Sequence, residues 1–232
     1  MYVGGLVPVP PRDTDRAYTP EAVQALLMSD YGVSRETIER FEAYQAILTK
    51  WAPRINLVGA STLASFWDRH ILDSAQILPL ARPEARTWVD FGSGAGFPGL
   101  VLAALVHHKD GAQVTLIEAS TKRCGFLREA ARAMQVHAEI INDKLEHVAP
   151  RPVDVITARA FTALDRLLAY GEKWQGPQTQ ALFPKGEEVS AELQQASTNW
   201  LFKSTIHPSA SDARGCIVEI TECQARTGSA LS

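Results

Sequence analysis

The sequence has little of several features that mark specialised classes of protein. It has three cysteines, an odd number without a C-x-x-C spacing, which argues against both a disulfide framework and a zinc site. Its longest fully apolar run, residues 100–106, is far shorter than the ~20 residues that cross a bilayer. The N-terminus has no basic region ahead of an apolar stretch, unlike a secretory signal. These absences predict a soluble, cytoplasmic protein without a metal or a membrane partner.

Neither sign of charge dominates the chain. It carries 23 Lys and Arg residues against 26 Asp and Glu, a formal net charge of −3. This balance excludes the uniformly positive surface of a general nucleic-acid binder but allows a local basic patch. The hydrophobic share of 46% is ordinary for a globular protein, and 232 residues are enough for one large domain, or one domain with a small appendage.

The residue pattern divides the chain into four parts. Residues 1–18, rich in glycine and proline, and the polar residues 224–232 predict a flexible arm and a flexible tail. Residues 19–82 predict helices without strands. In residues 83–223, short β-type runs alternate with helical stretches, which is typical of parallel β-α units and predicts the main domain.

The helices of the first part are predicted from caps and from apolar spacing. Thr19 followed by Pro20 is a cap pattern, and Ser34 is a second N-cap candidate. After Ser34, apolar residues recur at three and four positions, as on one stripe of a helix that ends before Pro53. The stripe consists of Ile38, Phe41, Tyr44, Leu48 and Trp51. A third helix is expected from Ser61 onward.

The main domain is expected to contain a mostly parallel sheet. Five β-type runs alternate with helical stretches, at residues 87–91, 114–117, 137–141, 153–157 and, more weakly, 181–183. The helical stretches lie at residues 100–107, 121–135, 163–174 and 187–197. Two last runs, 200–206 and 216–221, flank a turn region and predict an antiparallel hairpin that closes the sheet.

A glycine-rich loop between the first strand and the next helix is the most informative segment. It reads Asp90-Phe91-Gly92-Ser93-Gly94-Ala95-Gly96-Phe97-Pro98-Gly99. Glycines permit a sharp turn and let the backbone approach a ligand closely. Glu118 ends the next expected strand, where a carboxylate accepts hydrogen bonds from both ribose hydroxyls of an adenosine cofactor.

The glycine spacing narrows the choice of cofactor. The dinucleotide fingerprint G-x-G-x-x-G would need glycine at position 97, which is Phe97, and no lysine follows as in a phosphate-binding G-K-[ST] loop. A cofactor without a pyrophosphate is therefore favoured, and S-adenosylmethionine is the common adenosine cofactor of that kind. The alternative is a glycine-rich turn that only packs a helix against a strand.

Five separated motifs resemble those of a known family. They are residues 90–99, residues 69–74, Lys122-Arg123 with Phe126-Leu127, Arg159-Ala160, and Lys185-Gly186. Together they resemble the RsmG family, also called GidB, bacterial enzymes that methylate N7 of a guanine in small-subunit (16S) ribosomal RNA. The resemblance implies an α/β, Rossmann-like fold of the class I S-adenosylmethionine-dependent methyltransferases, with a seven-stranded, mostly parallel sheet after an N-terminal helical segment.

The resemblance also extends the expected cofactor site. To Gly94 and Glu118 it adds Gly92, Phe97, Leu145, Glu146 and Arg159. These added positions all follow the carboxyl end of an expected strand, where open parallel sheets bind their ligands. Arg159 is expected to pair with the methionine carboxylate, a substrate phosphate or an internal carboxylate such as Asp90, or else to form an ion pair that only holds its loop.

A local basic patch is the expected RNA contact. Residues 121–132 carry four basic side chains against one acidic, a local charge of +3 on one predicted helix. Such charge binds phosphates without reading bases, although on the residues alone simple solubility explains it as well. With the resemblance, the candidates for contact with 16S ribosomal RNA, free or within the small subunit, are Lys122, Arg123, Arg128 and Lys185.

The implied chemistry needs alignment more than proton transfer. Guanine N7 offers a lone pair without prior deprotonation, so no catalytic base is assigned. His70 and Asp73, three residues apart on a helix, are interpreted as a structural or substrate-positioning pair. The enzyme is expected to be a monomer. Two alternatives remain open: a class I methyltransferase acting on a small molecule, and a noncatalytic adenosine-nucleotide-binding regulatory module.

Overall fold

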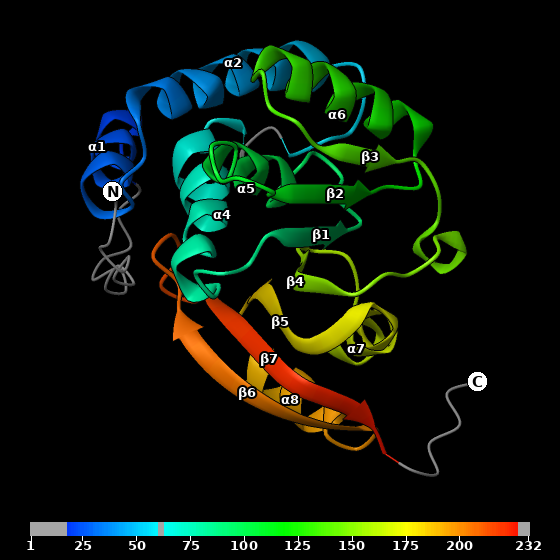
Figure 1. Cartoon of the computed structure of the whole chain (residues 1–232). Helices are drawn as coiled ribbons and strands as arrows, with labels where there is room; N and C mark the ends of the chain where they lie inside the picture. Colours follow the sequence, from blue (N-terminus) through cyan, green and yellow to red (C-terminus); the bar gives the residue numbers. More distant parts are fainter. Residues whose placement is uncertain (1–17, 60–62, 227–232) are drawn as a thin grey trace.

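The computed structural model describes residues 18–59 and 63–226, which form one seven-stranded sheet flanked by helices (Figure 1). The strand order is β3-β2-β1-β4-β5-β7-β6, and β7 is antiparallel to both of its neighbours while β1 to β5 are parallel. The strands are β1 (Thr87–Phe91), β2 (Gln113–Ile117), β3 (Glu139–Ile141), β4 (Val153–Ala158), β5 (Gln175–Lys185), β6 (Trp200–Pro208) and β7 (Cys216–Ala225). The predicted sheet and its closing hairpin are confirmed.

The largest differences from the sequence pattern are the lengths of β5 and β7. β5 was expected only at residues 181–183, because Gly176 and Pro177 are poor strand formers, yet it starts at Gln175, which pairs with Val153 before the register shifts. β7 runs to Ala225, opposite Trp200, and so passes the expected end of the domain at residue 223.

The N-terminal helices begin where their caps predict. Thr19 caps α1 (Pro20–Asp30) by accepting a hydrogen bond from the N–H of Ala22, and Ser34 caps α2 (Arg35–Trp51) in the same way. Tyr18, expected in the flexible arm, packs against the core. The predicted arm residues 1–17 and most of the predicted tail lie outside the described residues.

The third predicted helix is irregular. Its expected cap, Ser61, lies outside the described residues. The chain forms a π-helix, η1 (Phe66–Leu72), continues as α4 (Asp73–Ala75) and ends with a short 3-10 turn, η2 (Leu78–Leu80). An apolar stripe predicts a buried helical face, but π-helices are rare and usually short, so the sequence pattern did not indicate this change in winding.

Helices cover both faces of the sheet, and each face has its own core. The larger core joins α1, α2 and η1 to α5 (Gly99–Leu105) and α6 (Thr121–Ala133), and Figure 1 shows α2 lying along α6. Phe41, Tyr44 and Phe66 are fully buried there, each contributing roughly 1.5–3 kcal/mol. The N-terminal helices are thus part of the main fold.

The second core lies on the opposite face. It is covered by α7 (Leu164–Gly171) and α8 (Val189–Ala196), and the turns η3 (Leu145–His147) and η4 (Glu172–Trp174) complete it. In the part of the chain that the structure describes, no helix is long and apolar enough to cross a membrane, and no group of three His, Cys, Asp or Glu side chains could hold a metal ion.

Candidate functional site

The glycine loop leaves β1 with a backbone that only glycine adopts easily. Gly92, Gly94 and Gly96 have φ angles of +65°, +55° and +90°. In this left-handed region a side chain would be strained. The loop also returns to the sheet, because the N–H of Ser93 donates to the carbonyl of Ile117 at the end of β2, at 3.1 Å.

Glu118 holds the same loop from the end of β2. Its side chain is 6% exposed, and its carboxylate accepts hydrogen bonds from the N–H of Gly94 (2.9 Å) and of Ser120 (2.8 Å). Arg123 approaches it to 3.9 Å. The predicted ribose-binding carboxylate and the predicted glycine loop are thus in direct contact.

Asp90, the last acidic residue before the loop, is a buried carboxylate. One oxygen accepts a hydrogen bond from Thr157 Oγ1 on β4 at 2.9 Å, and Gly99 packs so closely that a Cβ there would lie 2.8 Å from the other. Burial raises the pKa of Asp90 to about 6, against the hydrogen bonds from Ser93 and Thr157 that lower it. Asp90 therefore links β1 to β4.

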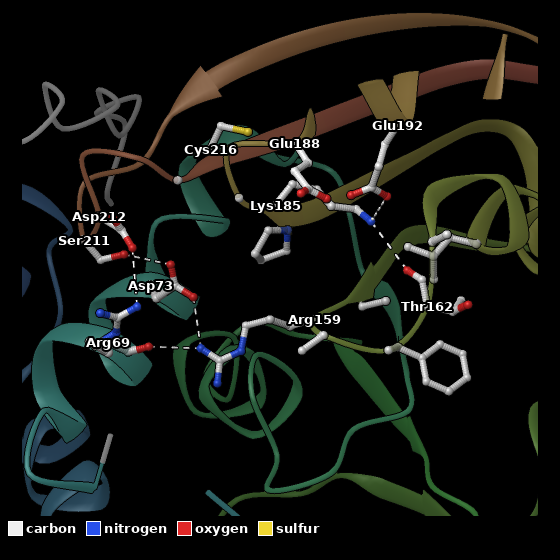
Figure 2. Close-up of a pocket in the computed structure, with 18 of the residues that line it drawn as sticks. Arg69, Asp73, Arg159, Thr162, Lys185, Glu188, Glu192, Ser211, Asp212 and Cys216 are labelled. Atoms are coloured by element: carbon white, nitrogen blue, oxygen red, sulfur yellow. Dashed lines mark hydrogen bonds and ion pairs between the residues drawn. The ribbon is translucent and has the colours of Figure 1, made fainter. Parts of the chain in front are cut away.

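Arg159 follows β4 and binds the N-terminal helices. Its guanidinium donates to Asp73 Oδ2 (3.0 Å), to the carbonyl of Arg69 (3.0 Å) and to His70 Nδ1 (2.9 Å), as Figure 2 shows for the first two. The internal carboxylate that pairs with Arg159 is thus Asp73, 86 positions away in the sequence, rather than Asp90. His70 and Asp73, expected to pair with each other, meet through Arg159. A cofactor contact of Arg159 stays a prediction.

Phe97 is packed into the larger core. Its side chain is 4% exposed and stacks on His70, with ring centroids 4.4 Å apart, while Arg159 lies 5.1 Å above the ring. Tyr44 on α2 packs on it at 5.1 Å and donates from its hydroxyl to the carbonyl of Ala95. The N-terminal helices therefore hold the glycine loop from behind, and apolar contact of Phe97 with a cofactor stays a prediction.

Leu145 and Glu146 lie on η3, beyond the end of β3. Leu145 is buried in the second core, whereas Glu146 is exposed and accepts a hydrogen bond from the hydroxyl of Tyr170 on α7. That hydrogen bond lowers the pKa of Glu146, so the carboxylate is charged at neutral pH. Their predicted contact with the cofactor remains a prediction.

A cavity of about 790 Å³ opens at the ends of β4 and β5, and Figure 2 shows the side chains around it. Lys185 projects into it with a side chain only 10% exposed and forms an ion pair with Glu192 Oε2 at 2.7 Å. Lys185 Nζ also lies 3.5 Å from the carbonyl oxygen of Thr162 in the loop after β4. Lys185, predicted to contact RNA, is therefore paired inside the protein.

The other predicted RNA contacts lie on α6. Lys122 and Arg128 are exposed, as the helical pattern predicts, and Cys124 is buried. Arg123 is partly covered because its guanidinium reaches both Glu118 and the carbonyl of Asn56. Contact of these cations with RNA stays a prediction.

Phe161 was missed by the sequence interpretation. It stands two positions after Arg159, lines the cavity and is 40% exposed. A Cβ at Gly92 would lie 2.2 Å from its ring, so the ring rests directly on the glycine loop. The available signal was an aromatic residue shortly after a parallel strand, outside any apolar stripe.

Residues 37–216 match the family described as rRNA small subunit methyltransferase G, GidB. The chain belongs to this family. A protein of Paramagnetospirillum magneticum named "Ribosomal RNA small subunit methyltransferase G" is 43% identical over 196 residues, covering 84% of this chain and 94% of that protein. A protein of the same name from Caulobacter vibrioides is 42% identical over 212 residues, covering 89% and 95%.

Solved structures of low sequence identity share the fold of this RsmG-family chain. Cofactor-bound Rv0187 from MTB has a TM-score of 0.57 at 14% identity, covering 88% of this chain and 98% of that one. A mutant of MtNAS in complex with S-adenosylmethionine has a TM-score of 0.54 at 16% identity, covering 90% and 86%. The predicted class I methyltransferase fold, family and S-adenosylmethionine cofactor are confirmed.

The glycine loop and Glu118 fit this cofactor. Beside Gly94, a Cβ would have only the carbonyl oxygen of Gly92 nearby, at 3.8 Å, so the loop leaves room on that side. Each carboxylate oxygen of Glu118 accepts a hydrogen bond from one backbone N–H, and a carboxylate oxygen can accept a second hydrogen bond. Ribose hydroxyls can therefore add to the existing contacts.

Proposed function

We propose that this protein transfers a methyl group from S-adenosylmethionine to N7 of a guanine in 16S ribosomal RNA. The observation that carries the proposal is the similarity, over more than four fifths of the chain, to proteins named ribosomal RNA small subunit methyltransferase G. The adjacency of the glycine loop and a large cavity supports it, because Phe161 touches Gly92 and also lines the cavity.

The chain's own residues would hold the cofactor from three strands. Backbone groups of Gly92 and Gly94 would lie against it, Glu118 would accept hydrogen bonds from the ribose, and Glu146 would orient the adenine edge. When bound, the cofactor supplies an electrophilic methyl group: the N7 lone pair forms the new N–C bond while the C–S bond breaks and its electron pair stays on sulfur.

No general base is assigned in the cavity. The acceptor nitrogen loses no proton in the reaction, so the side chains need only position the base and exclude water. Three carboxylates of the cavity are each bound to a cation: Asp73 to Arg159, Asp212 to Arg69, and Glu192 to Lys185. Their charges stabilise the walls, which is consistent with a mechanism without a base.

The RNA would be held through its phosphates on the surface beside the glycine loop. Lys122 and Arg128 are exposed on α6, the helix that follows Glu118. Positive charge on one helix provides affinity without base recognition, so selection of the guanine falls to the cavity. We propose that a single copy of the chain acts on the RNA within the small subunit or an assembly intermediate.

The test uses ribosomal RNA and small subunits from cells that lack this protein, incubated with the purified chain and methyl-labelled S-adenosylmethionine. Digestion and mass spectrometry should show label in 7-methylguanosine. Label in another nucleoside would reject the N7 assignment. Binding of S-adenosylmethionine without any transfer would favour a noncatalytic regulatory module. Transfer only to small molecules of a cell extract would favour a class I methyltransferase that acts on a small molecule.

A further inference from the structure

Phe161 is an exposed aromatic side chain on a loop that is held in place. Of the large apolar side chains that the described residues expose, namely Met28, Phe161, Leu201 and Ile206, it is the one aromatic. An isolated exposed apolar residue needs no explanation, but an aromatic ring at the wall of a cavity beside a cofactor loop does.

The loop around Phe161 is fastened on both sides. Arg159 is bound to Asp73, the N–H of Leu164 donates to Glu192 at 2.8 Å, and Lys185 binds that same carboxylate. The residue directly before Phe161 is Ala160, whose φ of +51° lies in the left-handed region that costs a non-glycine residue energy. The strained backbone at Ala160 is thus part of the loop conformation that directs the Phe161 ring toward Gly92.

The Phe161 ring lies between the glycine loop and the cavity. The ring lies against Gly92, which must lack a side chain to allow the approach, and it faces Tyr170 at a centroid distance of 6.1 Å. The acceptor base has to approach the methyl group from the side opposite to sulfur, in line with the bond that breaks. A base that enters from the cavity therefore meets Phe161.

The proposed reaction leaves a cationic base, and the cavity has few free anions to stabilise it. Asp73, Asp212 and Glu192 are bound to cations of the protein, and Glu188 is exposed, so that water screens its charge. The face of an aromatic ring attracts a cation without needing a counter-charge. An aromatic platform thus suits both the neutral substrate and the charged product.

We infer that Phe161 is the residue on which the target guanine stacks and that its ring stabilises the 7-methylguanine cation. This inference rests on the proposed function and adds to it the residue that contacts the base. Stacking of a base on an aromatic side chain is sequence-tolerant, so Phe161 would position the base while other cavity groups select guanine.

The first test compares Phe161→Leu with Phe161→Tyr in single-turnover methyl transfer to undermethylated small subunits at saturating S-adenosylmethionine. We expect the Leu variant to be about 10- to 100-fold slower and the Tyr variant to stay within about threefold of the natural protein. The dissociation constant of S-adenosylmethionine, measured by calorimetry, should change less than about threefold in both. Leu201→Ala, at a residue of nearly equal exposure (41%), is the matched control and should not alter the rate.

Several results would overturn the inference. They are an unchanged rate in the Leu variant, equal losses in the Leu and Tyr variants, or a loss explained entirely by weaker cofactor binding.

The second test does not depend on activity with ribosomal RNA. Calorimetry should show that the natural protein, saturated with S-adenosylhomocysteine, binds 7-methylguanosine monophosphate more tightly than guanosine monophosphate, and that Phe161→Leu removes the difference. Equal affinity of the natural protein for both nucleotides, or no binding of either, would reject the role of Phe161. Absence of 7-methylguanine in the RNA assay together with this preference would reject the rRNA substrate and keep the stacking residue.

Discussion

The loops after β1 and β4 leave neighbouring parallel strands at the same edge of the sheet, but different interactions hold them. The β1 loop is shaped by its own backbone, through three left-handed glycines and the N–H of Gly94 bound to Glu118. The β4 loop is held by side chains from elsewhere, through Arg159 on Asp73 and Lys185 near the carbonyl of Thr162. The conformation of the first loop therefore depends first on its glycines, with Tyr44 of α2 packed behind it, whereas the second loop depends mainly on side chains of other elements.

The largest effect is expected where the two loops touch. Gly92→Ala places a methyl group 2.2 Å from the Phe161 ring on a backbone with φ of +65°, so the ring and the loop must both move. We expect more than a roughly 100-fold loss of methyl transfer and a loss of roughly 2–4 kcal/mol in the free energy of unfolding. Transfer kinetics and urea unfolding measure both.

Gly111→Ala is the matched control for that change. Gly111 also has a left-handed φ, +74°, but nothing lies within 4 Å of its added Cβ. It should cost only about 1–2 kcal/mol and leave methyl transfer unchanged. Equal losses at both positions would show that backbone strain alone, and not the contact with Phe161, makes glycine necessary in the first loop.

Removing the guanidinium that holds the second loop should come next. Arg159→Ala leaves Asp73 in a largely buried place without its cationic partner, although the hydrogen bonds from Gln76 and Ser211 remain, and we expect a cost of about 3–4 kcal/mol together with slower methyl transfer. Arg159→Lys should recover only part, because one ammonium cannot reach Asp73, His70 and the Arg69 carbonyl together. Lys203→Ala, which breaks the exposed pair with Glu222, should cost less than about 1 kcal/mol. Similar costs for the two Ala variants in urea unfolding would contradict the assigned role of Arg159.

Asp90, which connects the two strands, should make stability depend on pH. Its pKa is raised to about 6 in the folded protein, so the folded state holds the proton more tightly than the unfolded state. The resulting stabilisation is complete below about pH 4 and is lost as the pH rises through about 6, a change of up to about 3 kcal/mol.

Asp90→Asn keeps an oxygen for Thr157 and has no carboxyl to ionise. The variant should therefore gain stability relative to the natural protein between pH 5 and pH 8, as measured by urea unfolding at both values. A difference between the two proteins that does not change with pH would contradict the raised pKa.

The smallest effects are expected on RNA binding, where exposed basic side chains should contribute to the affinity and internally paired ones should not. Lys122→Ala and Arg128→Ala should each weaken RNA binding less than about tenfold and reduce the slope of log affinity against log salt by about 1. Lys185→Met should leave that slope unchanged, because Lys185 is paired with Glu192. Fluorescence anisotropy with a ribosomal RNA fragment at several salt concentrations measures the slopes, and a reduced slope for Lys185→Met would place it on a phosphate.

The difference between the two loops, one shaped by its own residues and one held by distant side chains, also explains which features could be predicted from the sequence. The caps at Thr19 and Ser34, the strands and the glycine loop depend on neighbours in the chain, so local patterns predicted them. The partner of Arg159 could not be predicted, because Asp73 is 86 positions away in the sequence, on α4 directly after the π-helix. Phe161 was missed for the same reason, since its importance comes from contact with Gly92.

The tyrosine at position 44 bears on how the enzyme can be handled as a reagent. Its hydroxyl donates a hydrogen bond to the Ala95 carbonyl, and its ring packs on Phe97, so helix α2 supports the glycine loop. A truncated protein that begins at β1 would expose the ring of Phe97 and lose the contacts of Tyr44 with the glycine loop. Fusion partners and affinity tags should therefore be joined ahead of residue 18, leaving every N-terminal helix in the expressed polypeptide.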